Sequence, residues 1–364
     1  MRGAMGEEAD LQGLATGDIA DALARILPTC LHRSVRVVGI DHRPSPYSTT
    51  FALHEVDATL DDGSNLELVV KDMSRAAMLP IARQTRPRFL HNPHREVAIY
   101  RVLAPYGDLH LARYWGDIVD PRSGRCWLFL ERVGGLALRH TGEFACWLDA
   151  ARWLARFHGR FAGREAVDVA GRVPLVRYDA RYYQHWADRA VARIERSTGS
   201  TIDQRFASWL QKRYAAVVES LLSLPLSVVH GDYYAANILV RSDDGSHHIC
   251  PVDWELAGLG PGLVDLAALT AGGWTAEQRR ALVHAYWEAL PQDQAWFPSV
   301  QTLEHALAYC RLHVAVQWLG WSDAWTPPPD QAQDWLGEAK RIAEHIDRSV
   351  WSRSAVKAWG DHGM

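Results

Sequence analysis

The sequence is poor in cysteine and has no long apolar run. Its cysteines are odd in number, dispersed and without CxxC spacing: Cys30, Cys126, Cys146, Cys250 and Cys310. This distribution argues against a disulfide framework or a zinc knuckle. No run of about 18 apolar residues occurs, so no membrane span is expected. We expect a cytoplasmic protein whose cysteines are buried as small hydrophobic residues.

A strong charge of one sign is also absent, and we expect no secretory signal. The net charge is −4 at pH 7 and no block of lysine or arginine stands out, so no nucleic-acid partner is expected. The first residues, MRGAMGEEADLQG, carry acidic side chains where a signal needs an apolar core. The 364 residues, 48% hydrophobic and 23% charged, are typical of a soluble globular protein with two domains or lobes.

Strand-like patterns fill the first third of the chain. After one helical pattern near the N-terminus, residues 34–72 predict three antiparallel strands, with DDGSN as a hairpin turn. NPHREVAIYRVLAPYG predicts a helix that Asn92 caps, and two more strands follow around PRSG. We therefore expect a compact nucleotide-binding lobe of five antiparallel strands and one main helix, residues 1–133, which ends before Gly134 and Gly135.

The rest of the chain is mostly helical. Periodicity is strong in EFACWLDAARWLARFHGRFAG, and only SVVH, NILVR and HHICPVDWE are strand-like. Further helical patterns span residues 178–195, 202–222, 275–290, 299–320 and 330–350. We expect an α+β bilobal fold in which residues 134–364 form a helical catalytic and acceptor-binding lobe with one embedded hairpin.

A group of polar residues lies between two of these strand-like runs. The segment VVHGDYYAANILV places Asp232 and Asn237 between them, and Asp253 follows the next strand. Phosphoryl transfer needs a carboxylate beside the attacking hydroxyl and a metal that neutralises the phosphate oxygens. Asp232 suits the first role, as catalytic base, while Asn237 and Asp253 are hard oxygen ligands for Mg²⁺. A hairpin brings positions 237 and 253 to one end of a cleft.

These segments resemble a known family. HGDYYAANILV, followed by ICPVDWELAGLGPGLVDLAAL, looks like the Brenner-type motif and the metal-binding segment of the aminoglycoside phosphotransferase/choline kinase superfamily. Asp232 and Asn237 match the HxDxxxxN pattern, and Asp253 matches the Asp of the DFG-equivalent segment. The resemblance covers about residues 30–350. It implies a protein-kinase-like fold, ATP and Mg²⁺ as cofactors, and transfer of the γ-phosphate to a hydroxyl of a small molecule.

The resemblance extends to a nucleotide site in the first lobe. Lys71 ends the strand LELVVKDM, and Glu96 lies in the first turns of the next helix. The family implies that these residues are a phosphate-binding lysine and the glutamate that holds it. The alternatives are a solvated strand-end lysine and a glutamate that complements the helix dipole. CWLFLERVGG resembles the interlobe hinge, which implies adenine contacts from the backbone of Leu130, Glu131 and Val133.

The phosphate-covering loop departs from the kinase pattern. DHRPSPYSTTFAL contains no glycine, so the GxGxxG cradle is absent. Ser48 and Thr49 are candidates to donate hydroxyl or backbone N–H groups to phosphate, and an ordinary polar hairpin turn is the alternative.

The resemblance gives three further residues supporting roles. We expect His230 to orient the catalytic loop through hydrogen bonds rather than to act as a base. Asp265 is expected to anchor that loop, and His158 to pack in the core.

The acceptor is a small molecule with a hydroxyl group, and the sequence names only candidates for its site. The substrate candidates are Tyr233, Glu255, Glu304 and Trp321, with Arg311 and Asp323 in the same part of the chain. Residues 299–325 carry few acids, which suits a sugar or another neutral or singly charged compound at least as well as a polycationic aminoglycoside. The sixteen tryptophans, with Trp325 among the C-terminal ones, are interpreted as core packing or as an aromatic wall of a ligand pocket.

Two other functions compete with the kinase interpretation. A catalytically silent relative would bind a nucleotide or a partner without turnover. Loss of a catalytic or nucleotide-binding residue would favour this function, but Lys71, Asp232, Asn237 and Asp253 are all present. A metal phosphoesterase would need GNH-type segments that are missing; its candidate metal ligands are His230, Asp232, His247 and His248. The choice between ATP and GTP and the oligomeric state stay open.

Overall fold

The computed structural model describes residues 14–197, 200–243, 246–291, 296–321 and 332–350. The chain folds as two compact units. The first comprises residues 1–84 and 112–133, and the second comprises residues 85–111 and 134–364. Residues 85–111 thus group with the second unit, and the functional division at residues 133 and 134 stays a prediction.

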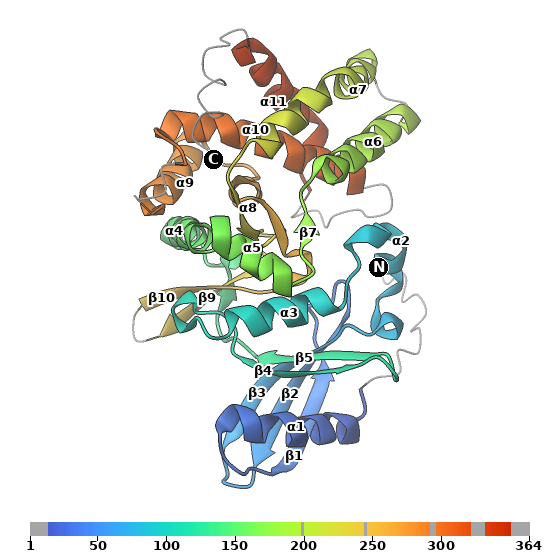
Figure 1. Ribbon diagram of the computed structural model, residues 1–364, viewed down its shortest axis with the longest axis vertical. Helices are drawn as coiled ribbons and strands as arrows, with labels where there is room; N and C mark the ends of the chain where they lie inside the picture. The colour runs from blue at the N-terminus through green and yellow to red at the C-terminus, as the bar shows by residue number, and fades with distance from the viewer. Residues whose placement is uncertain (1–13, 198–199, 244–245, 292–295, 322–331, 351–364) are drawn as a thin grey trace, which may run out of the picture. The chain divides into compact units, whose positions relative to one another are not determined.

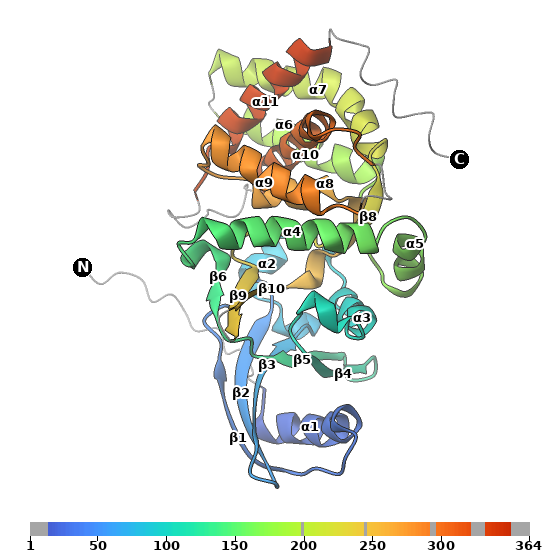
Figure 2. The same cartoon turned by 90° about the vertical axis from the view of Figure 1, so that its left-hand side faces the viewer.

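The first unit is built on the five-stranded antiparallel sheet that the sequence predicts. Its strands lie in the order β1-β2-β3-β5-β4. They are β1 (Val37–Pro44), β2 (Ala52–Leu60), β3 (Asn65–Asp72), β4 (Tyr114–Asp120) and β5 (Arg125–Glu131). Alternate residues of β2 are buried, as a strand with one face on a core requires. Helix α1 (Thr16–Leu31) packs against β1 and β4 and covers that core (Figure 2).

Helices make up most of the second unit (Figure 1). Helix α4 (Phe144–Arg160) packs against α8 and α9 and also against strand β10. Helix α10 (Val300–Trp321) contacts α6, α7, α8, α9 and α11. The remaining helices are α3 (His94–Leu103), α5 (Gly163–Arg172), α6 (Ala180–Arg196), α7 (Thr201–Leu222), α8 (Leu263–Leu269), α9 (Ala276–Ala289) and α11 (Trp335–Val350). The short helix α2 (Pro80–Thr85) lies where the chain passes from one unit to the other.

The strands on either side of residues 230–237 and the strand before Asp253 belong to two small sheets of the second unit. One has the order β10-β9-β6 and contains the predicted hairpin, in which Pro251 pairs with Ile238. The other has the order β7-β11-β8. The strands are β6 (Leu136–Ala137), β7 (Val176–Arg177), β8 (Leu226–Val229), β9 (Ile238–Asp243), β10 (Ser246–Pro251) and β11 (Gly258–Pro261).

The predicted α+β fold is confirmed, and the differences are local. The helix expected from NPHREVAIYRVLAPYG ends at Leu103, before a separate turn at Gly107–Leu109. Strand β11 was not predicted, because glycine and proline have little strand propensity; it forms because β7 and β8 flank it. All five cysteines are free, and four of them are buried. Among the described residues, no helix combines the length and the apolarity that crossing a membrane would require.

Candidate active site

Residues 230–237 form a tight loop that joins β8 to β9. The loop turns at Gly231, whose φ of +81° belongs to the left-handed region that favours glycine. A Cβ at this position would lie 2.3 Å from the carbonyl oxygen of Leu256. Only glycine lets the loop approach the segment after Asp253 this closely.

Asp265 of α8 anchors the backbone of this loop. Its buried carboxylate accepts hydrogen bonds from the backbone N–H of His230 at 2.7 Å and of Gly231 at 2.9 Å. The ring Nε2 of His158 lies 3.2 Å from the same carboxylate, and its Nδ1 lies 2.9 Å from Tyr286 Oη. These donors compensate a buried charge that would otherwise be costly, so Asp265 fixes the position of the loop.

The ring of His230 links the loop to the strand before Asp253. Its Nε2 lies 3.0 Å from the carbonyl oxygen of Val252, which can only accept, so Nε2 carries the proton. Its Nδ1 accepts the backbone N–H of Asp232 at 3.3 Å. Both ring nitrogens are therefore engaged in holding the backbone, and His230 is fully buried.

Asp232 and Asn237 face one another within the loop. The Nδ2 of Asn237 donates to Asp232 Oδ2 at 2.8 Å and to the Asp232 carbonyl at 3.0 Å. Loss of hydration first, and then the nearby carboxylates of Asp253 and Glu255, raise the pKa of Asp232 to about 7. The Asn237 hydrogen bond acts in the opposite direction. A carboxyl group with such a pKa can take up a proton near neutral pH.

The β9–β10 hairpin brings Asn237 and Asp253 to the same end. The backbone N–H of Val252 donates to the Asn237 carbonyl at 2.9 Å, one residue before Asp253. Asp253 has φ 65° and ψ 63°, a left-handed conformation that is rare for residues other than glycine. Such backbone strain costs on the order of 1–3 kcal/mol and is concentrated at functional sites.

Three carboxylates gather beside this point, and they fit a divalent cation. One oxygen each of Glu96, Asp253 and Glu255 lies within 4.8 Å of the others. Glu96 and Glu255 are buried, so their charges repel strongly unless positive charge is at hand. Carboxylate and amide oxygens are the ligands that Mg²⁺ prefers, and the Asn237 oxygen belongs to the same chemical class.

Two buried arginines hold the segment after Asp253, and sequence reasoning missed both. Arg86 Nη1 lies 2.6 Å from Glu255 Oε1. Arg95 Nη1 donates to the Glu255 carbonyl at 2.6 Å and to the Leu90 carbonyl at 2.9 Å. Burial lowers the pKa of Arg95 to about 10, with a smaller effect from Arg86. No sequence pattern marks these contacts, because they join positions about 160 to 170 residues apart.

The nucleotide candidates of the first unit lie on its sheet and its first hairpin. Lys71 is 6% exposed on β3, between Leu53 of β2 and Leu128 of β5, so it is not a solvated strand-end lysine. The hydroxyl of Ser48 donates to the Ser45 carbonyl at 3.1 Å and accepts the Leu53 N–H at 3.0 Å. That hydroxyl therefore stabilises the turn, while Thr49 is exposed beside it.

The hinge candidates differ in how far they belong to the sheet. Leu130 pairs with Val69 of β3 and with Tyr114 of β4. The N–H of Glu131 donates to the Arg113 carbonyl at 2.9 Å, so it is engaged within the sheet. Val133 lies beyond the end of β5 and stays the strongest hinge candidate.

The substrate candidates differ in their surroundings. The prediction for Tyr233 is wrong, because its side chain is fully buried and its hydroxyl donates to the Ala150 carbonyl at 3.1 Å. Tyr234 is half-buried, and its Oη accepts Trp318 Nε1 at 2.5 Å. Trp321 stacks on the buried Trp186 with ring centroids 5.3 Å apart. The carboxylate of Glu255 forms an ion pair with Arg86.

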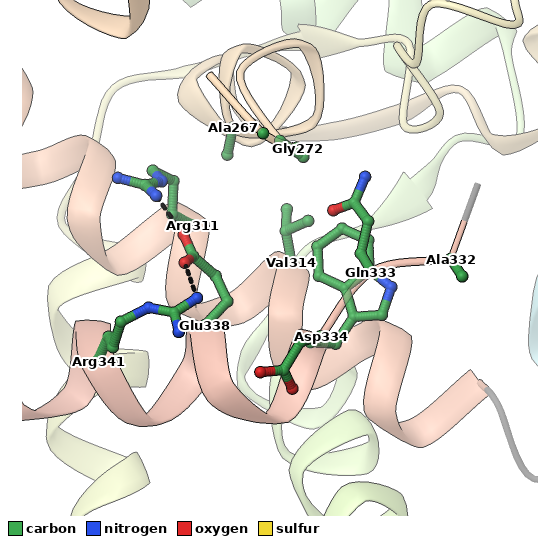
Figure 3. A pocket seen from close by; sticks show the side chains of 12 residues that line it. Ala267, Gly272, Arg311, Val314, Ala332, Gln333, Asp334, Glu338 and Arg341 are labelled. Atoms are coloured by element: carbon green, nitrogen blue, oxygen red, sulfur yellow. Dashed lines mark hydrogen bonds and ion pairs between the residues drawn. The ribbon is translucent and has the colours of Figure 1, made fainter. Parts of the chain in front are cut away.

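Glu304 and Arg311 belong to a different part of the helical unit. Glu304 lines a cavity of about 700 Å³ with residues of α9 and α11. It lies about 21 Å along α10 from Trp318, at about 1.5 Å per residue, and its contact with the acceptor stays a prediction. Arg311 is paired with Glu338 of α11, which also holds Arg341 at 3.0 Å (Figure 3). Asp323 and Trp325 lie outside the described residues.

The metal set of the phosphoesterase alternative is not assembled. His230 binds the Val252 carbonyl, His247 lies against Cys146, and His248 stacks on His110. Within the described ranges, no group of metal-ligating side chains combines these histidines with Asp232.

Several solved structures have a fold similar to that of this chain. A choline/ethanolamine kinase family protein from Mesorhizobium loti is 17% identical with a TM-score of 0.54, covering 94% of this chain and 98% of its own. Ethanolamine kinase from Plasmodium vivax is 12% identical with a TM-score of 0.51, covering 87% and 83%. The spectinomycin phosphotransferase APH(9)-Ia is 12% identical with a TM-score of 0.51, covering 93% and 99%.

The sequence itself identifies the family. Residues 52–297 match the model of APH, the phosphotransferase enzyme family, and the chain belongs to it. No curated protein matched the sequence significantly. The family resemblance is thereby confirmed, and the protein is a small-molecule kinase that uses a nucleotide to phosphorylate a hydroxyl group.

Proposed function

We propose that this kinase uses ATP and Mg²⁺ and that Asp232 is its catalytic base. One observation supports the proposal: the Asp232 carboxylate accepts a 2.8 Å hydrogen bond from Asn237 Nδ2, and Asp253 lies at the same end of the β9–β10 hairpin as Asn237. The acceptor oxygen forms a bond to the γ-phosphorus, the bond from that phosphorus to the β,γ-bridging oxygen breaks, and ADP leaves. The proton of the acceptor hydroxyl passes to Asp232.

Asn237 and Asp253 hold Mg²⁺ in this proposal, with Glu96 and Glu255 as neighbouring carboxylates. The bound cation supplies positive charge that neutralises the phosphate oxygens. Arg86 and Arg95 keep the Asp253 segment in place through Glu255.

The first unit supplies the nucleotide contacts in this proposal. Lys71 binds the α- and β-phosphates, and the backbone of Val133 binds adenine. Thr49 is the remaining loop donor to phosphate, since the Ser48 hydroxyl already bonds within its turn.

The acceptor is proposed to be a small hydroxyl compound that is neutral or carries one positive charge. Aromatic groups accompany the catalytic loop at Tyr234 and Trp318. Helix α10 contains a single acid, Glu304, which lies far from this end of the helix. A polycationic acceptor would need a denser set of carboxylates.

The test is ADP release from Mg-ATP over a panel of sugars, amino alcohols and aminoglycosides. We expect turnover with at least one acceptor and its loss in Asp232→Asn, with nucleotide binding retained. Asp108→Asn, an exposed aspartate paired with Arg160, is the matched control and should keep full activity. Hydrolysis of phosphoesters without ATP would favour the phosphoesterase, and nucleotide binding without turnover on any acceptor would favour the silent relative.

A further inference from the structure

A second group of metal-ligating side chains lies near the other end of the β9–β10 hairpin. Cys146 Sγ and His247 Nδ1 are 3.2 Å apart. Glu143 is the residue that precedes α4, and Cys146 follows it by three positions, on the same side of the first turn. One carboxylate oxygen of Glu143 completes a set in which all three ligand atoms lie within 4.8 Å of one another.

The spacing of the Cys146 sulfur and the His247 nitrogen is close to that of two ligands of a tetrahedral zinc. With Zn–S at about 2.3 Å and Zn–N at about 2.0 Å, a tetrahedral angle separates the two ligand atoms by roughly 3.5 Å. The observed sulfur–nitrogen distance of 3.2 Å is close to that value. The Cys146–His247 pair therefore needs little movement to close around a metal, and the exposed side chain of Glu143 has room to join them.

The chemistry of the set differs from that of the proposed magnesium site. Thiolate and imidazole are borderline or soft ligands that select Zn²⁺ over Mg²⁺. His247 precedes Asp253 by six residues, which separates the two groups by up to roughly 20 Å along an extended chain. A metal at one group does not need to occupy the other.

We propose that Glu143, Cys146 and His247 form a zinc site that fastens strand β10 to the start of α4. Solvent supplies the fourth ligand, because two of the three protein ligands are exposed. Binding exchanges the S–H bond of Cys146 for a Zn–S bond, and the proton goes to solvent. The site supports a strand that leads directly to Asp253, and it does not depend on the proposed catalytic roles.

Cobalt titration of the full-length protein tests the proposal, because Co²⁺ substitutes for Zn²⁺ and absorbs when a thiolate binds it. We expect one Co²⁺ per chain and a thiolate-to-cobalt charge-transfer band in the near ultraviolet. Cys146→Ser should abolish the band, and His247→Gln should weaken Co²⁺ binding by at least about 10-fold. Because His247 is exposed, its variant should fold normally.

Two control variants make the result specific. His248→Gln changes the neighbouring residue, which the strand alternation turns to the opposite face and which stacks on His110. Cys30→Ser removes the half-buried cysteine of the other unit. Both should keep the band. A band that survives in Cys146→Ser, a band lost in either control, or the absence of stoichiometric Co²⁺ binding overturns the proposal.

Discussion

The side-chain amide of Asn237 donates a 2.8 Å hydrogen bond to the carboxylate of Asp232. This bond orients both groups. The amide nitrogen is used on Asp232, so the amide oxygen is the atom that remains to serve a cation. One contact thus couples the proposed base to the proposed metal site.

Loss of that contact should impair turnover more than folding. We expect Asn237→Ala to lower kcat by about 10²-fold or more, because it removes both the orienting bond and a metal ligand. The measurement is steady-state kinetics with the acceptor that the panel identifies. Gln184→Ala is the control, since it breaks an exposed amide–carboxylate pair of the same 2.8 Å length. Equal kcat in Asn237→Ala and the parent protein contradicts the assignment.

The closeness of Gly231 to Leu256 predicts a strong effect of a single methyl group. Gly231→Ala should destabilise the second unit by more than about 2 kcal/mol, since a left-handed alanine and a backbone clash add together. Gly142→Ala is the matched control, because its φ is +68° and nothing lies within 4 Å of the added Cβ. Urea unfolding measures both. Similar losses in the two variants would show that the clash with Leu256 is relieved without cost.

The Arg86–Glu255 pair should behave as a buried ion pair. Removing one partner leaves a buried charge, so Arg86→Met and Glu255→Gln are each expected to cost about 3–5 kcal/mol of unfolding free energy. The double variant should lose less than the sum of the two. Asp149→Asn, which breaks the exposed pair with Arg152, should change stability little. If the loss of unfolding free energy in the double variant equals the sum of the losses in the two single variants, Arg86 and Glu255 are not coupled.

His313 predicts how stability depends on pH. Burial lowers the pKa of His313 to about 3, whereas an unfolded histidine titrates near 6.5. Below pH 6.5 the unfolded chain takes up a proton that the folded chain refuses, so stability falls as pH falls toward 3. Between pH 7 and pH 5 this one group should cost about 2 kcal/mol.

His313→Gln isolates that contribution, because glutamine has no titrating group and can still accept from Tyr214 Oη, 3.0 Å from the histidine Nδ1. Urea denaturation at pH 7 and pH 5 should show a drop that is about 2 kcal/mol smaller in the variant than in the parent protein. The same drop in both proteins refutes the predicted linkage.

Much of the fold and the family could be predicted, because local patterns carry them. The alternation in β2 and the periodicity of α4 report burial on one face, and HGDYYAANILV reports a loop between strands. The residues that contact the substrate were harder to predict. Tyr233 stands next to Asp232 in the chain, yet its hydroxyl meets Ala150, because neighbouring residues in a loop point in different directions.

The sequence by itself determined which chemistry this chain carries: a carboxylate, an amide and a second carboxylate at spacings that a loop and a hairpin bring together. The tertiary structure alone decided which distant groups meet them. Arg86 reaches Glu255, Asp265 reaches the Gly231 N–H, and His247 reaches Cys146. Such pairings depend on how whole helices pack, and packing is set by buried surfaces summed over many residues rather than by any local motif.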